Sequence, residues 1–164
     1  MGTERDKERV IDVKRLYIAY GSNLNLDQMK YRCKTAKIYG KGILKGYRLL
    51  FKGSPGNAYL TIEPRAGGEV PVVVWDVKAE NEKALDRYEG YPSFYYKENI
   101  PVELEDGQVV EAFVYIMTGK IKDRIHLNLP SKNYLQAVRE GCESFGFNQK
   151  YIDEALKVSK ERKS

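Results

Sequence analysis

The middle of the chain is dominated by segments typical of β-strands, and this feature constrains the fold more than any other. These segments are rich in β-branched and aromatic residues and are separated by short stretches that contain glycine. We predict strands over residues 16–20, 43–51, 59–62, 70–77, 95–104 and 109–117. Residues 64–68 (PRAGG) are expected to join two separate strands, and residues 105–108 (EDGQ) are typical of a hairpin turn.

Segments with a helical pattern lie between these strands and at the end of the chain. We predict helices over residues 26–33, 79–88, 131–144 and 149–160. Asn25 or Asp27 is expected to cap the first, Gly90 to end the second and Ser131 to cap the third. About six strands clustered among four helices, without strict alternation of the two, indicate an α+β fold.

The length of the chain favours a single domain. With 164 residues, it can bury a core without support from disulfides or metal ions. Residues 1–14 are strongly polar, and we expect them to form a flexible leader before one domain over residues 15–164.

Several function classes are not expected from the composition. Cys33 and Cys142 form no C-x-x-C pair and His126 is the single histidine, so we expect no metal site. No apolar run approaches the roughly 20 residues of a membrane helix, and the charged start does not resemble a secretory signal. A cytoplasmic location without membrane contact is therefore predicted. The sequence does not indicate the oligomeric state.

The first candidate site is the sequence Tyr20-Gly21-Ser22-Asn23-Leu24. A predicted strand ends there in a small turn that leads into a helix, and backbone N–H groups in such a turn can converge on an anion. Gly21 would allow a ligand to approach the backbone closely. The alternative is an ordinary strand–helix connection in which Asn23 is only a turn former.

The second candidate is Glu89, at the predicted end of a helix and among several tyrosines. The chain has 13 tyrosines, and four of them surround Glu89 in the sequence: Tyr88, Tyr91, Tyr95 and Tyr96. A carboxylate at a helix C-terminus in an aromatic environment is expected to have a raised pKa, which suits acid–base chemistry. The alternative is a solvated glutamate at a helix end.

Together these motifs resemble the γ-glutamylcyclotransferase-like superfamily, which includes AIG2-like proteins. The resemblance rests on five motifs that follow the family's order between residues 16 and 147: the Tyr-Gly-Ser-Asn-Leu loop at residues 20–24, Leu85-Asp86 before Glu89-Gly90, Tyr96, Tyr115, and Pro130-Ser131-x-x-Tyr134.

The resemblance implies a small mixed β-barrel with surrounding helices. It also implies a reaction in which the α-amine of a small γ-glutamyl substrate attacks its own γ-carbonyl and releases 5-oxoproline, without a cofactor. Glu89 would be the general acid and base, and backbone amides from Gly21 to Leu24 would hold the substrate. Four tyrosines would surround the glutamyl group: Tyr20, Tyr96, Tyr115 and Tyr134.

The resemblance also bears on the leaving group. Asn23 places the chain nearer to enzymes acting on γ-glutamyl amino acids, and to the deacylating relatives of antibiotic biosynthesis, than to glutathione-specific relatives, which typically carry Tyr-Gly-Ser-Leu. Residues 54–57 and 119–128 are expected to form the rim around the leaving group.

Two rival functions remain open from the sequence. The same pocket could belong to a non-catalytic module that binds an amino acid or a γ-glutamyl group, although such a module has no evident need for Glu89. Nucleic-acid binding is the other, because the formal net charge is +5. We rank it last and expect no nucleic-acid partner, because the cationic residues are spread along the chain without a recognition motif.

Overall fold

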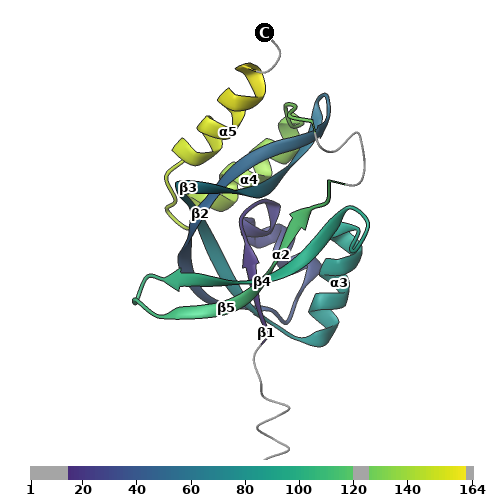
Figure 1. Cartoon of the computed structure of the whole chain (residues 1–164). Coiled ribbons are helices and arrows are strands. Elements are labelled where there is room, and N and C mark those ends of the chain that lie inside the picture. Colours follow the sequence, from purple (N-terminus) through teal and green to yellow (C-terminus); the bar gives the residue numbers. More distant parts are fainter. Residues whose placement is uncertain (1–14, 120–125, 162–164) are drawn as a thin grey trace, which may run out of the picture.

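A closed barrel of five strands forms the centre of the structure, a computed structural model that describes residues 15–119 and 126–161 (Figure 1). The strands are β1 (Arg15–Ala19), β2 (Lys37–Ser54), β3 (Asn57–Val77), β4 (Tyr95–Leu104) and β5 (Val109–Met117). Their order around the barrel is β1-β3-β2-β4-β5, and the barrel closes where β1 runs parallel to β5. All other neighbours are antiparallel, so the mixed barrel in an α+β fold is confirmed. The leader predicted at residues 1–14 lies outside the described residues.

The prediction of about six strands was one too high, because β3 is a single strand where two were expected. Its residues 64–69 stay beside β2: Pro64 pairs with Tyr47 and Glu69 with Lys45, so that residues 65–68 face only Gly46. The run of proline and glycine is therefore a bulge inside a long strand rather than a connection between two strands. At Gly68 a Cβ atom would lie 2.3 Å from the carbonyl oxygen of Tyr47, so only glycine fits.

The bulge divides the β2–β3 hairpin into two parts. One part consists of the start of β2 and the end of β3. It pairs with β1 through residues 73–77 and with β4 through Gly42 and Ile43, and so belongs to the barrel. The part beyond the bulge, residues 47–64, pairs along its length only with itself among the strands of the structure described here. We call residues 47–64 the hairpin arm; α5 packs against its β2 side (Figure 1).

The described residues form four α-helices outside the barrel: α2 (Leu26–Arg32), α3 (Ala79–Glu89), α4 (Lys132–Ser144) and α5 (Lys150–Glu161). The Asn25 side chain accepts a hydrogen bond from the backbone N–H of Gln28, and Ser131 caps α4 through the N–H of Tyr134. Gly90 ends α3 with a φ of 66°, a left-handed conformation that favours glycine. A short 3₁₀ turn, η1 (Ser22–Leu24), connects β1 to α2.

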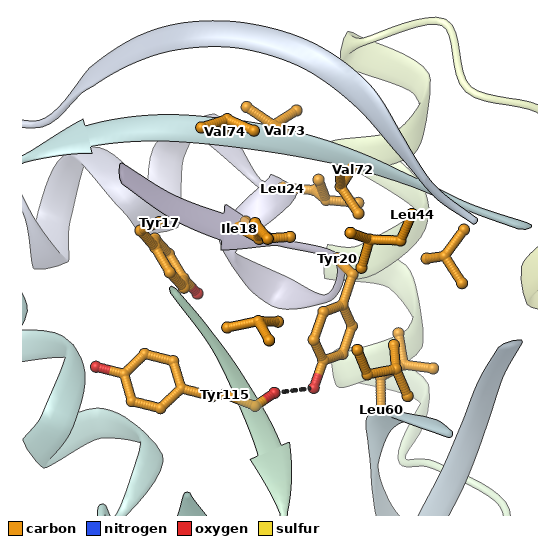
Figure 2. Close-up of a cluster of buried hydrophobic side chains, with 14 of the residues drawn as sticks. Tyr17, Ile18, Tyr20, Leu24, Leu44, Leu60, Val72, Val73, Val74 and Tyr115 are labelled. Atoms are coloured by element: carbon orange, nitrogen blue, oxygen red, sulfur yellow. Dashed lines mark hydrogen bonds between the residues drawn. The ribbon is translucent and has the colours of Figure 1, made fainter. Parts of the chain in front are cut away.

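Side chains from β1 and from Tyr20 directly after it lie at the centre of the hydrophobic core. Figure 2 shows Ile18 and Tyr20 among Leu24, Leu44, Leu60 and the valines of β3. Helix α4 packs directly on η1, since a Cβ atom at Gly141 would lie 2.6 Å from the carbonyl carbon of Leu24. The turn after β1 is thus held in place by two contacts, one with the hydrophobic core and one with α4. Among the described residues, no helix is both long enough and apolar enough to cross a bilayer.

Candidate active site

A cavity of about 250 Å³ opens where β1 ends, between the barrel and the hairpin arm. Its wall is largely aromatic and includes Tyr17, Tyr20, Tyr59, Tyr88, Phe94, Tyr95, Tyr115 and Tyr134. Glu89 is the one acidic or basic side chain that the described residues contribute to this wall. An aromatic pocket with few polar groups is typical of a site for a small molecule.

The turn after β1 forms one side of the cavity. Gly21, Ser22 and Asn23 line it, and the backbone around them is held by hydrogen bonds from Leu24 N–H to Gly21 and from Asn25 N–H to Ser22, both 3.0 Å long. A Cβ atom at Gly21 would lie 3.3 Å from the Tyr134 hydroxyl, so glycine here keeps the wall open. The loop predicted from the sequence therefore lies at the cavity.

Two of the predicted substrate-binding residues do not line the cavity. Leu24 is 1% exposed and packs in the core, and its N–H is used within the turn. Tyr96 is 41% exposed, because successive side chains of β4 point to opposite faces and its neighbour Tyr95 is the one that faces inward. The Tyr95 hydroxyl donates a hydrogen bond of 2.9 Å to the carbonyl oxygen of Leu60.

Glu89 is the last residue of α3, and its side chain faces the cavity. Burial raises its pKa from the ordinary 4.5 to about 7, although the positive charge of Arg32 acts in the opposite direction. Within residues 15–119 and 126–161, no hydrogen bond or ion pair to this carboxylate is found. A group with a pKa near 7 is present in both protonation states at neutral pH, which suits proton transfer.

The tyrosine wall is held rigid by hydrogen bonds. The Tyr20 hydroxyl donates to the carbonyl oxygen of Tyr115 at 2.7 Å (Figure 2), and the Tyr115 hydroxyl donates to Asp86 at 2.6 Å. The Tyr134 hydroxyl accepts a bond of 3.1 Å from the N–H of Leu60. Burial raises the pKa of all three hydroxyls, so they are neutral near pH 7.

The hairpin arm supplies the rim of the cavity. Gly53, Ser54 and Asn57 line it, whereas Pro55 and Gly56 of the predicted rim do not. The chain after residue 125 runs beside the arm, where Gly53 N–H donates to the carbonyl oxygen of His126 at 3.0 Å. Most of the predicted rim segment 119–128, namely residues 120–125, lies outside the described residues.

Several site residues were not predicted from the sequence. Tyr17, Tyr59 and Phe94 line the cavity, and Arg32 lies behind its wall in contact with Asn23 and Tyr88. Strand alternation could have linked Tyr17 with Tyr95 and Tyr115 as inward-facing residues. No sequence signal indicated Arg32, because its partners lie on two other elements.

The remaining reactive side chains are placed unfavourably for catalysis. Cys33 and Cys142 are both buried, and burial raises the pKa of the Cys142 thiol to about 11. In the part of the chain that the structure describes, no group of three or more His, Cys, Asp or Glu residues could hold a metal ion.

A protein-family model described as "Gamma-glutamyl cyclotransferase, AIG2-like" matches residues 17–136. The chain belongs to this family. The human protein named γ-glutamylcyclotransferase is 29% identical over 151 residues, which is 87% of this chain and 77% of that protein. The mouse protein of the same name is 30% identical over the same shares of the two chains.

The solved structures agree with this family assignment. A structure named γ-glutamyl cyclotransferase superposes with a TM-score of 0.75 at 26% identity, covering 87% of this chain and 86% of that one. The resemblance seen in the sequence motifs is thereby confirmed at the level of the family and of the fold.

Proposed function

We propose that this member of the γ-glutamyl cyclotransferase, AIG2-like family releases 5-oxoproline from a γ-glutamyl amino acid or γ-glutamyl amide. The observation that supports the proposal most is Glu89, a carboxyl group with a pKa of about 7 in an aromatic cavity beside the glycine turn. We also propose that the protein is cytoplasmic and that the reaction needs no cofactor.

The reaction is an intramolecular transfer of an acyl group. The α-amine nitrogen of the substrate forms a bond to the γ-carbonyl carbon, and the amide bond between that carbon and the leaving nitrogen breaks. The attacking nitrogen loses a proton and the leaving nitrogen gains one, so no water is consumed. Glu89 takes the first proton as a carboxylate and returns it to the leaving nitrogen as a carboxylic acid.

The cavity can contribute to this reaction in two ways. Holding the flexible glutamyl chain folded for attack can lower the barrier by roughly 7 kcal/mol or more. Proton transfer by Glu89 is expected to add about 10²–10⁴ in rate. Gly21, Ser22 and Asn23 line the cavity, and their backbone amides would hold the substrate carboxylate or the developing oxyanion.

The test is a panel of γ-glutamyl amino acids, glutathione and γ-glutamyl amines, with 5-oxoproline measured by mass spectrometry. We expect product from the wild type, and a loss of about 10²–10⁴ in turnover for Glu89→Gln, which keeps the shape of the side chain but cannot transfer the proton. Glu143→Gln on the exposed face of α4 is the matched control and should keep full activity.

The result also separates the enzyme from a binding module. Full activity of Glu89→Gln would remove Glu89 from the proposed role. Binding of a γ-glutamyl compound by the folded wild type without any 5-oxoproline would support the non-catalytic module instead.

A further inference from the structure

Arg32, the last residue of α2, contacts both sides of the candidate site from behind the cavity wall. Its guanidinium group donates hydrogen bonds to the Asn23 side chain at 2.5 Å and to the Gln28 side chain at 2.8 Å. The same group lies 3.4 Å from the centre of the Tyr88 ring. Asn23 belongs to the turn after β1, whereas Tyr88 directly precedes Glu89 at the end of α3.

These contacts form a closed ring of neighbours. The hydroxyl groups of Ser22 and Tyr88 share a hydrogen bond of 3.0 Å, and the Asn23 amide donates to the Tyr17 hydroxyl at 2.8 Å. The turn and the end of α3 are therefore joined twice, once through Ser22 and once through Arg32. The second connection is charged, and it also reaches the cavity wall at Tyr17.

We propose that Arg32 is a positioning residue of this site, which braces the η1 turn against the end of α3 and thereby fixes the place and the electrostatic environment of the Glu89 carboxylate. The inference rests on the role proposed for Glu89. Arg32 does not line the cavity, so it acts through Asn23, Tyr88 and Glu89 rather than on a substrate.

The ionisable side chains around Glu89 indicate that the charge of Arg32 has a large influence on the Glu89 carboxylate. The titratable side chains that line the cavity together with Glu89 are tyrosines: Tyr17 of β1, Tyr20 directly after it, Tyr59 of β3, Tyr88 of α3, Tyr95 of β4, Tyr115 of β5 and Tyr134 of α4. Burial raises the pKa of five of these hydroxyls, which are therefore neutral near pH 7: Tyr17, Tyr20, Tyr95, Tyr115 and Tyr134. Among the described residues, Arg32 supplies the charge that acts on the pKa of Glu89, and it lowers this pKa.

The geometry requires arginine rather than any cation. A planar guanidinium can stack on an aromatic ring and donate several hydrogen bonds in fixed directions at the same time. A lysine ammonium in the same place would keep the charge but could not stack on Tyr88 while bonding Asn23 and Gln28. Replacement by lysine therefore separates the charge of Arg32 from its bracing contacts.

The experiment compares Arg32→Met and Arg32→Lys with Lys30→Met, a control that removes an exposed cation from the same helix. The Glu89 carboxyl group is titrated by ¹³C NMR in each protein, and the release of 5-oxoproline is measured from pH 5.5 to 9. In Arg32→Met the titration midpoint should rise by about half a pH unit or more, because an attractive charge is lost. The acid limb of the activity profile should move by the same amount.

Arg32→Lys should keep the midpoint close to that of the wild type and lose roughly tenfold in turnover, because the braced geometry is relaxed. Lys30→Met should change neither quantity. An unchanged midpoint in Arg32→Met, or wild-type turnover in Arg32→Lys, would overturn the proposal. If Arg32→Met does not fold, the turnover of Arg32→Lys, corrected for its folded fraction, decides.

The titration also keeps this inference separate from the function proposed above. If the wild type forms no 5-oxoproline, the proposed reaction fails. The NMR midpoints then still show whether Arg32 controls Glu89.

Discussion

The Glu89 carboxyl group affects the folding stability of the protein as well as the proposed reaction. Its pKa is raised from 4.5 to about 7, so the folded protein binds a proton there more tightly than the unfolded chain does. Below pH 4.5 the group is protonated in both states and costs no stability. Between pH 4.5 and 7 the cost grows, and above pH 7 it is fully present.

We therefore predict that Glu89→Gln stabilises the protein at pH 8 and leaves its stability unchanged at pH 4. The upper limit is about 3 kcal/mol, and we expect about 1–3 kcal/mol because the Glu89 side chain is only partly buried and water screens its charge. Thermal unfolding of both proteins at the two pH values measures the difference. Equal melting temperatures at pH 8 would show that the carboxylate is not destabilising in the folded state.

Helix α3 shows the same chemical group in two opposite environments. Glu82, Asp86 and Glu89 follow one another at the spacing that places side chains on one helical face. Glu82 binds Arg15 at 2.9 Å and Lys97 at 2.7 Å, and Asp86 binds Lys97 at 3.0 Å. The first two carboxylates are thus compensated and attach the helix to β1 and β4, whereas the third faces the cavity.

Glu82→Gln is expected to destabilise the protein at neutral pH by about 1–2 kcal/mol, because Arg15 and Lys97 lose a shared carboxylate. The hydrogen bonds from Arg15 are the largest cause of the lowered pKa of Glu82, which is about 2. This contribution is present above pH 4.5 and is lost as the pH falls toward 2.

Denaturant unfolding of wild type and Glu82→Gln at pH 7 and at pH 3 would measure the change. The gap between the two proteins should shrink at the lower pH, with Glu143→Gln as a control that leaves it at zero. A gap that stays constant with pH would mean that the ion pairs contribute nothing to stability.

The whole molecule consists of a closed barrel and a hairpin arm that the bulge at residues 65–68 separates. Glu89, the η1 turn and most of the tyrosines are attached to the barrel or to helices packed on it. Gly53, Ser54, Asn57 and Tyr59 lie on the arm. A substrate in the cavity would therefore contact both parts.

Gly68→Ala tests the connection between the two parts. A Cβ atom there would lie 2.3 Å from a backbone oxygen of β2, so the bulge must shift, at a cost of about 1–3 kcal/mol. We expect a higher KM for γ-glutamyl substrates and an unchanged NMR midpoint for Glu89, with Ala66→Ser in the same bulge as the control. A changed midpoint would mean that the arm and the barrel are not independent.

At this scale the sequence predicted the parts of the fold that depend on local signals. The hairpin of β4 and β5, the cap at Ser131 and the end of α3 at Gly90 all follow from nearby residues. The continuity of β3 did not, because a bulge with proline and glycine has the same composition as a loop. Only the pairing with β2 distinguishes the two.

In the candidate site, too, local motifs could be predicted from the sequence, whereas features that depend on the fold could not. Glu89 and the turn at residues 21–23 could be placed at the cavity from their motifs. The choice between Tyr95 and Tyr96 depended on which face of β4 turns inward, and local sequence does not fix this. The role inferred for Arg32 depended on its contact with Tyr88 of α3, which is distant in the sequence.

The bulge also has a consequence for the history of such a protein. Substitutions on the arm can reshape the part of the cavity that Gly53, Ser54 and Asn57 line without disturbing the ion pairs that hold α3 to the barrel. Under the proposed function, lineages with this architecture can diversify their preferences for the released amine while the residues around Glu89 are inherited unchanged.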